Sequence, residues 1–191
     1  NQSGILQRIN EIIKKNVGDW ELATKPLFIR KCGDGSLEEC SFRKWFIQDY
    51  AFVRECFHWE ARLLGRKELP RYVQNILVIS LKNLEEEISW FEERAKKESI
   101  NINEITINPI CQKYINFLIE LESYEWSICF SAIWALEKIY LESWKNVLPG
   151  NIKFKSYIEH WTNDSFEMFV NNVEDIMIKV LKEQENLDIN I

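Results

Sequence analysis

Three polar side chains interrupt the apolar stripes of segments that have helical periodicity. They are Asp49, Tyr114 and Glu137. An ionised carboxylate buried without partners is costly, so such a group is normally paired, hydrogen-bonded or protonated. An aspartate and a glutamate that face one site, with a tyrosine hydroxyl nearby, provide a base, an acid and an orienting donor. The pattern therefore makes these residues candidates for acid–base chemistry on a bound ligand.

Large apolar side chains surround each of these three positions. Around Asp49 the stripe consists of Phe42, Trp45, Phe46, Phe52, Val53, Cys56 and Phe57. Around Tyr114 it consists of Ile110, Phe117, Leu118 and Leu121. Around Glu137 it consists of Trp126, Phe130, Ile133, Tyr140 and Trp144. Walls this rich in aromatic rings suit a flat heterocyclic ligand.

Each residue taken alone also has a purely structural interpretation. A lone aspartate on an apolar stripe is commonly paired with an arginine. The same segment offers three candidate partners for Asp49, which are Arg43, Arg54 and Arg62. Tyr114 would be an ordinary core residue whose hydroxyl needs one partner, and Glu137 could lean to the surface from the stripe edge. The functional interpretation depends on the three occurring together.

Other chemistries are less well supported by the sequence. The only histidines are His58 and His160, and neither follows a glutamate at the Glu-x-x-His spacing of di-iron bundles. His58 and Glu60 are two residues apart, which places them on different faces of a helix. No glycine-rich phosphate loop is present, and no residue pattern indicates a Ser-His-Asp triad. We therefore predict neither a metal site nor a cofactor.

Composition narrows the class of protein. The chain has 191 residues, of which 46% are hydrophobic and 13% aromatic, as expected for one domain with a large core. A net charge of -6 and a pI near 5.2 argue against a nucleic-acid partner. No apolar run has the roughly 18 residues of a membrane span. Five cysteines without a CxxC motif are typical of free thiols in a reducing cytoplasm, so we expect a cytoplasmic location.

The elements that must position these residues are all helical. Prolines separate helix-sized blocks, and the predicted helices span about 4–17, 41–66, 70–98, 110–123, 125–147, 152–160 and 164–186. We expect an extended connection over 100–108 and a turn at 33–36. Ser41 is the predicted N-cap of the second helix, and Asn163 or Asp164 that of the last. The prediction is a single all-α helical bundle over residues 1–191.

Several motifs resemble the TenA (thiaminase II) family, whose helical fold is shared with haem oxygenase. They are Asp34-Gly35-Ser36-Leu37, Phe42-Arg43-Lys44-Trp45 and Gln48-Asp49-Tyr50, within the run DGSLEECSFRKWFIQDYAFV. Further segments resemble the branch of the family that lacks an active-site cysteine, and these are 80–95, 112–118, 131–144 and 160–170. The resemblance extends over roughly residues 25–180 and depends on the motifs in combination.

The resemblance implies an enzyme of thiamin salvage. TenA-like proteins hydrolyse aminopyrimidines by replacing the 5-aminomethyl amine with hydroxyl. Some also cleave thiamin, and the branch without the cysteine is linked to deformylation of the formylaminomethyl pyrimidine. Asp49 matches the residue that binds the ring, Tyr114 a pocket tyrosine and Phe52 an aromatic wall residue. Trp134 and Tyr140 complete the predicted substrate-binding set. The resemblance also implies a homo-oligomer, either a dimer or a tetramer.

This chain departs from the family pattern at the expected nucleophile. Ala132 occupies the cysteine position, or Ser131 after a one-residue shift, and Cys129 is three residues too early. Glutamates must then do the chemistry, with Glu137 as the leading candidate and Glu142 as the second.

The end of the chain is a second departure. The family carries a further catalytic glutamate in a final helix, whereas this sequence ends at NLDINI, which predicts either a truncated chain or an absent role. A non-catalytic pyrimidine-binding or regulatory protein is therefore the alternative. A haem or quinone-cofactor oxygenase is disfavoured, because only His58 and His160 could ligate an iron.

Overall fold

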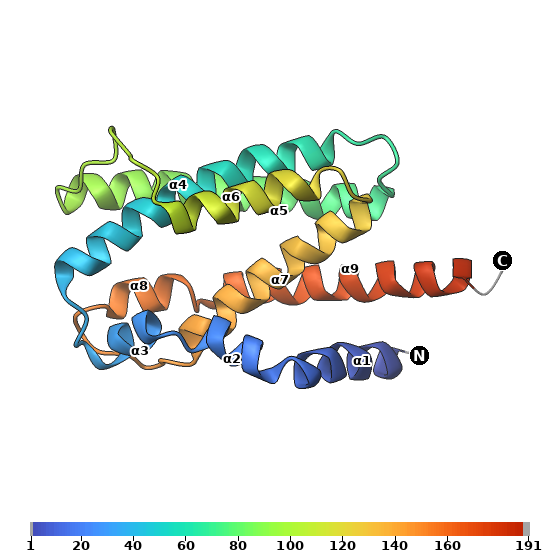
Figure 1. The fold of residues 1–191 in the computed structure, drawn as a ribbon, viewed down its shortest axis with the longest axis horizontal. Coiled ribbons are helices and arrows are strands. Elements are labelled where there is room, and N and C mark those ends of the chain that lie inside the picture. Colours follow the sequence, from blue (N-terminus) through green and yellow to red (C-terminus); the bar gives the residue numbers. More distant parts are fainter. Residues whose placement is uncertain (1, 189–191) are drawn as a thin grey trace. The chain divides into compact units, whose positions relative to one another are not determined.

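The computed structural model describes residues 2–188, and every regular element in that range is an α-helix (Figure 1). In chain order these are α1 (Gln2–Lys15), α2 (Val17–Thr24), α3 (Leu27–Asp34), α4 (Glu39–Leu64), α5 (Arg71–Lys97), α6 (Pro109–Leu121), α7 (Trp126–Lys145), α8 (Lys155–His160) and α9 (Asp164–Asp188). The predicted all-α class is confirmed. Residues 189–191 of the terminal NLDINI stretch lie outside the described residues.

Most local predictions agree with the observed elements. Asn163 caps α9, because its Oδ1 accepts the Phe166 N–H at 2.9 Å. The segment 100–108 has no regular structure, as expected for a connection. Only the second half of the turn predicted at 33–36 is outside a helix, because Gly33 and Asp34 belong to α3. After α3 the chain turns at Gly35, which has a φ of 80°, and the Asp34 Oδ1 accepts the Ser36 N–H at 2.8 Å.

Two local predictions were wrong. Ser41 is not an N-cap, because α4 begins at Glu39 and Ser41 lies inside its first turn. Helices α2 and α3 were not predicted at all. Each is only eight residues long, which is too short for a clear helical period in the sequence.

Contacts divide the chain into two compact units. One consists of Asn1–Leu37 with Phe130–Ile191, and the other of Glu38–Cys129. Helix α7 begins in the second unit and continues into the first. That residues 1–191 form one domain stays a prediction.

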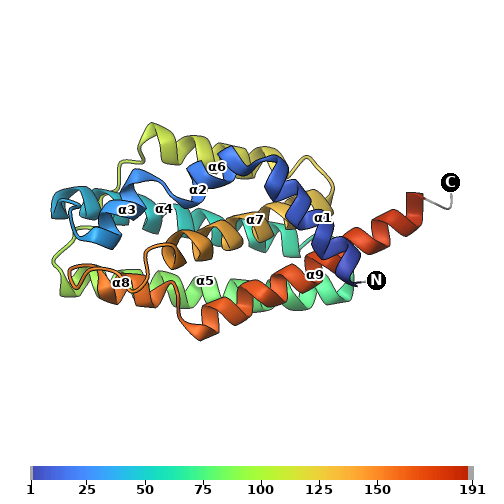
Figure 2. The same cartoon turned by 90° about the horizontal axis from the view of Figure 1, so that it is seen from below.

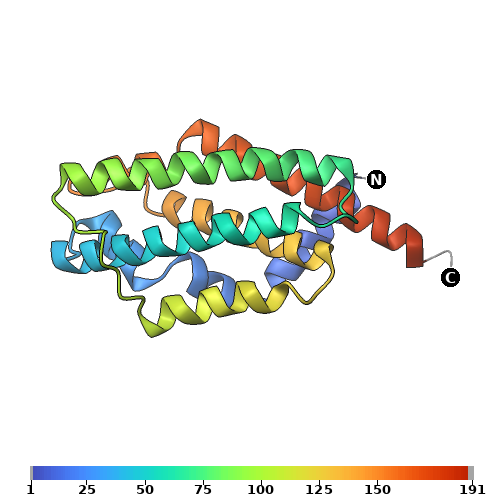
Figure 3. The same ribbon diagram turned by 90° about the horizontal axis from the view of Figure 1, so that it is seen from above.

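In the unit 38–129, α4 lies between α5 and α6 (Figures 1 and 3). Phe46 on α4 packs against Phe91 on α5, with ring centroids 4.8 Å apart, and both rings are fully buried. The Tyr50 hydroxyl donates to Glu92 Oε1 at 2.9 Å across the same pair of helices. These contacts fix α4 against α5, because burying aromatic area is the largest favourable term available to such a pair.

In the other unit, α1 runs beside α9 (Figures 1 and 2). Ile9 and Ile178 form a buried contact between them, and three partly buried side chains pack against it: Ile13, Trp134 and Leu181. A second cluster consists of stacked rings, with Trp144 and Trp161 centroids 4.7 Å apart. Gly33 allows α3 to approach the end of α7, because a Cβ there would come within 2.6 Å of Val147 Cβ.

Among the described residues, the most deeply buried carboxylate belongs to Glu60 on α4. It lies one turn beyond Cys56 on the stripe around Asp49 but was not among the predicted site residues. Its exposed fraction is 4%, and burial raises its pKa from 4.5 to about 7. The nearby hydroxyl of Ser80 on α5 lowers the pKa of Glu60, but the effect of burial is larger. Neither Glu60 Oε2 nor Ser80 Oγ has a well-formed hydrogen bond to the residues that the structure describes. Glu60 is therefore most stable in the fold as a neutral acid.

We expect Glu60 to make stability depend on pH. Because its pKa is higher in the folded than in the unfolded chain, its contribution is fully present below pH 4.5 and is lost as the pH rises through about 7. Between pH 5 and 8 the unfolding free energy of the wild type should fall by about 2.5 kcal/mol relative to Glu60→Gln, which cannot ionise. Urea denaturation of both proteins across this range measures the difference. Glu93→Gln, at an exposed position of α5, should follow the wild type; parallel curves for wild type and Glu60→Gln would contradict the assignment.

None of the helices within residues 2–188 combines the length and the apolar character needed to cross a bilayer.

Candidate functional site

Three of the predicted site residues lie together at the junction of α4 and α6. Phe52 follows Asp49 by one turn of α4, and its ring meets the Tyr114 ring of α6 edge to face, with centroids 5.4 Å apart at 88°. The charge of Asp49 acts on the Cys111 thiol, one turn before Tyr114 on α6. The unit 38–129 thus brings a carboxylate, a phenol and an aromatic wall to one place.

The residue before Asp49 explains how α6 is positioned. The Gln48 side-chain amide donates to the Thr106 carbonyl at 3.0 Å and accepts the Asn108 N–H at 2.9 Å. Asn108 in turn caps α6, because its Oδ1 accepts the Cys111 N–H at 2.8 Å. The Gln48 side chain therefore fixes the position of residues 106–108, which lead into α6. Tyr50 bonds to α5 instead, so the motif Gln48-Asp49-Tyr50 links α4 to both neighbouring helices.

Gln48→Met should loosen the start of α6. The variant keeps the length of the side chain but loses both bonds to the connection 106–108, which should lower the unfolding free energy by about 1–2 kcal/mol. Urea denaturation measures this value. Gln112→Met is the matched control, since the Gln112 side chain donates within α6, to Asn116, and not to the connection 106–108. Equal stability of the two variants would contradict the role of Gln48 in fixing residues 106–108.

Three of the five thiols, those of Cys32, Cys111 and Cys129, are poor nucleophiles in this fold. Burial raises the pKa of Cys111, and the negative charges of Asp49 and Glu55 raise it further. The Cys111 Sγ donates to the Gln48 carbonyl at 3.6 Å. Burial also raises the pKa of Cys129, and it raises that of Cys32 to about 12. These groups remain protonated at neutral pH, whereas the thiolate is the attacking form.

One part of the stripe prediction for α6 was wrong. Ile110, Tyr114 and Phe117 do not belong to its buried side, because their exposed fractions are 75%, 50% and 49%. The buried side consists of Ile115, Leu118 and Leu121. Both faces of this helix are apolar in sequence, so periodicity alone could not choose between them. The half-exposed ring of Tyr114 is accessible to a ligand.

The arginines considered as partners of Asp49 make other contacts. Arg43 donates to Glu39 Oε1 at 3.1 Å and to the Glu98 carbonyl at 3.0 Å. Arg62 pairs with Glu122 at 2.6 Å. The Arg54 guanidinium lies over the Tyr50 ring, 5.6 Å from its centroid.

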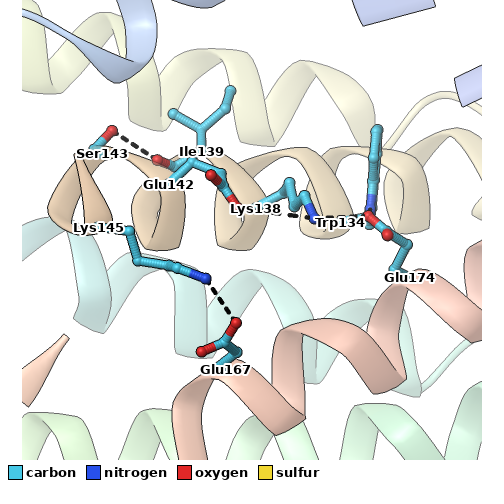
Figure 4. A network of polar contacts seen from close by, with 8 residues as sticks. All are labelled: Trp134, Lys138, Ile139, Glu142, Ser143, Lys145, Glu167 and Glu174. Carbon is cyan, nitrogen blue, oxygen red and sulfur yellow. Dashed lines mark hydrogen bonds and ion pairs between the residues drawn. The ribbon is translucent and has the colours of Figure 1, made fainter. Parts of the chain in front are cut away.

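The other predicted site residues lie along α7, in the first unit. Glu137 and Tyr140 are partly buried, and the Tyr140 ring packs against Trp144 and Trp161 at 6.3 and 5.7 Å. Trp134 contacts the Ile9–Ile178 cluster. Its indole Nε1–H donates to Glu174 Oε2 of α9 at 3.0 Å (Figure 4). That these α7 residues and the Asp49 group act on one substrate remains a prediction.

A polar network connects α7 to α9 (Figure 4). The Lys138 Nζ lies 3.3 Å from Glu174 Oε2 and 4.0 Å from Glu142 Oε1. Farther along, Lys145 Nζ donates to Glu167 Oε1 at 2.7 Å. Sequence reasoning missed Glu174, although it interrupts an apolar stripe as Asp49 and Glu137 do. That stripe consists of Val170, Val173, Met177, Ile178 and Leu181.

The described residues 2–188 contain no group of three His, Cys, Asp or Glu side chains arranged to hold a metal ion.

Comparisons with known proteins place these residues in a family. A protein of Glycine max named as a probable bifunctional TENA-E protein is 28% identical over 169 residues, which cover 84% of this chain and 74% of the relative. The structure of a TenA homologue from Pyrococcus furiosus superposes with a TM-score of 0.83 at 25% identity, covering 91% of this chain and 84% of the homologue.

A second solved structure has the same fold. It is a TenA family transcription regulator from Silicibacter sp. TM1040, with a TM-score of 0.78 at 17% identity, over 83% of this chain and 73% of the regulator. At that identity the likeness concerns the fold alone. The sequence model of the TENA/THI-4/PQQC family matches residues 20–189, which is most of the chain. The chain therefore belongs to the TENA/THI-4/PQQC family.

Proposed function

We propose that this protein is an aminopyrimidine hydrolase of thiamin salvage. The substrates would be the aminomethyl pyrimidine, the formylaminomethyl pyrimidine, or both. The observation that carries the proposal is the grouping of Asp49, Phe52 and Tyr114 at the α4–α6 junction. These are the residues that the family resemblance selects for binding a pyrimidine ring. The TENA-E name of the Glycine max relative agrees with an enzyme of this kind.

Each residue has a defined task in the proposed reaction. The Asp49 carboxylate accepts hydrogen bonds from the 4-amino group and from a protonated ring nitrogen, because a carboxylate forms strong charge-assisted hydrogen bonds. Phe52 packs against the ring, and the Tyr114 hydroxyl orients the substituent that leaves. Glu137 takes a proton from the attacking water and delivers one to the departing nitrogen. Trp134 and Tyr140 are the two further residues that we propose to contact the substrate.

The two substrates differ in the bond that breaks. With the aminomethyl pyrimidine, the bond between the exocyclic carbon and nitrogen is cleaved, water supplies the hydroxyl, and ammonia leaves. With the formylaminomethyl pyrimidine, water adds to the formyl carbon, the amide C–N bond breaks, and formate and the free amine result. Neither reaction changes an oxidation state, so neither requires a redox cofactor, and no thiol takes part.

The proposal is tested by incubating the protein with each pyrimidine and identifying products by mass spectrometry. Hydroxymethyl pyrimidine with ammonia, or aminomethyl pyrimidine with formate, is the expected outcome. Absence of turnover with both substrates would overturn it. Thermal stabilisation by a pyrimidine without product would instead support the alternative of a non-catalytic binding or regulatory protein. Ala132, where the family resemblance places a cysteine, is the observation that favours this alternative.

A further inference from the structure

The Glu174 carboxylate of α9 binds two side chains that are one turn apart on α7. The Trp134 indole N–H and the Lys138 ammonium both reach its Oε2, at 3.0 and 3.3 Å (Figure 4). In sequence these two residues flank Glu137. Among the carboxylates drawn in Figure 4, Glu174 is the one that contacts a residue before Glu137 and a residue after it.

This double contact determines how α7 is turned about its own axis. Trp134 and Lys138 are only ~40° apart around a helix of 3.6 residues per turn, so one acceptor can serve both. Around the axis of α7, Glu137 is then ~60° from Trp134, so it does not point directly at α9. The packing of Trp134 against Ile9 and Ile178 supports the same rotation.

The contact is shielded enough to be persistent. The side chains of Lys138 and Glu174 have exposed fractions of 20% and 17%, whereas those of Lys145 and Glu167 have 35% and 39%. Exposed ion pairs contribute little, and a partly buried pair with a further hydrogen bond contributes more. The second pair connects the same two helices but flanks no predicted catalytic residue.

We propose that Glu174 is a positioning residue for Glu137. By holding Trp134 and Lys138 it would set the direction in which the Glu137 carboxylate meets the substrate. This role rests on the proposed function, in which Glu137 transfers the protons. A small rotation of α7 would displace the carboxylate from the reacting atoms, and catalytic rates are sensitive to displacements of about 1 Å.

The test compares the steady-state kinetics of variants on pyrimidine substrates. Glu174→Leu should lower kcat about tenfold or more and change KM less than threefold, because binding by Asp49 is untouched. Glu174→Gln keeps an acceptor for the indole and should recover part of kcat. Trp134→Phe keeps the ring in its cluster but removes the N–H, so its effect should not add to that of Glu174→Leu.

Glu167→Leu is the matched control, because it removes the Lys145 pair between the same helices. It should leave kcat and KM within twofold of the wild type. A loss of kcat equal to that of Glu174→Leu would overturn the positioning role and indicate general docking of α7 on α9.

Unchanged kinetics of Glu174→Leu in an active enzyme would also overturn the positioning role. An inactive wild type would refute the proposed function itself and this role with it. If Glu174→Leu does not fold, Glu174→Gln and Trp134→Phe decide the question.

Discussion

Glu137→Gln is expected to reduce kcat for pyrimidine hydrolysis by roughly a hundred- to ten-thousand-fold, the range typical of a lost general acid–base. Glutamine has nearly the same shape but cannot take up or release a proton at neutral pH. Because the proposed binding contacts come from Asp49, Phe52 and Tyr114, the dissociation constant for the substrate should change little. Single-turnover kinetics and equilibrium binding, measured on the same preparation, separate the two effects.

Glu142→Gln is the control for this prediction. Glu142 lies on the same helix, five residues further along, and contacts Lys138 only weakly, with 4.0 Å between Nζ and Oε1. Its replacement should leave kcat within a few-fold of the wild type. Should Glu142→Gln be the inactive variant and Glu137→Gln an active one, the roles of the two glutamates would have to be exchanged.

Asp49→Asn is expected to lower kcat/KM by roughly a hundredfold, mainly through weaker binding. The amide keeps one acceptor but loses the negative charge, and charge-assisted hydrogen bonds are about twice as strong as neutral ones. Calorimetric titration with the aminomethyl pyrimidine measures the loss directly. Glu55→Gln is the control, because Glu55 is the other carboxylate whose charge acts on Cys111. Its effect on kcat/KM should be small.

The same variant carries a readout that does not depend on activity. The negative charge of Asp49 helps to raise the pKa of the Cys111 thiol. Asp49→Asn should therefore lower that pKa, increase the thiolate fraction at a fixed pH and accelerate alkylation of Cys111. Peptide mass mapping follows the rate at this residue. Unchanged alkylation together with unchanged kcat/KM would mean that Asp49 lies apart from both Cys111 and the substrate.

The sequence alone predicted the helical class and most helix positions. Apolar periodicity and proline punctuation identified the long helices, and Asn163 signalled the start of the last one, because these signals act between residues close in sequence. The interruptions at Asp49 and Glu137 were visible for the same reason. The likeness of the Gln48-Asp49-Tyr50 region to the TenA family is also a property of consecutive residues, so the sequence was sufficient to reveal it.

Only the tertiary structure decided which faces are covered and which distant residues meet. Periodicity groups residues on one side of a helix, but both sides of α6 are apolar, and packing buried Ile115 and Leu118 and left Tyr114 half-exposed. Glu60 is buried because α5 covers its side of α4. The contacts of Gln48 with Asn108 and of Glu174 with Trp134 join residues 60 and 40 positions apart. Contacts between residues this far apart in sequence depend on how whole helices pack, and a pattern of neighbouring residues does not determine that packing.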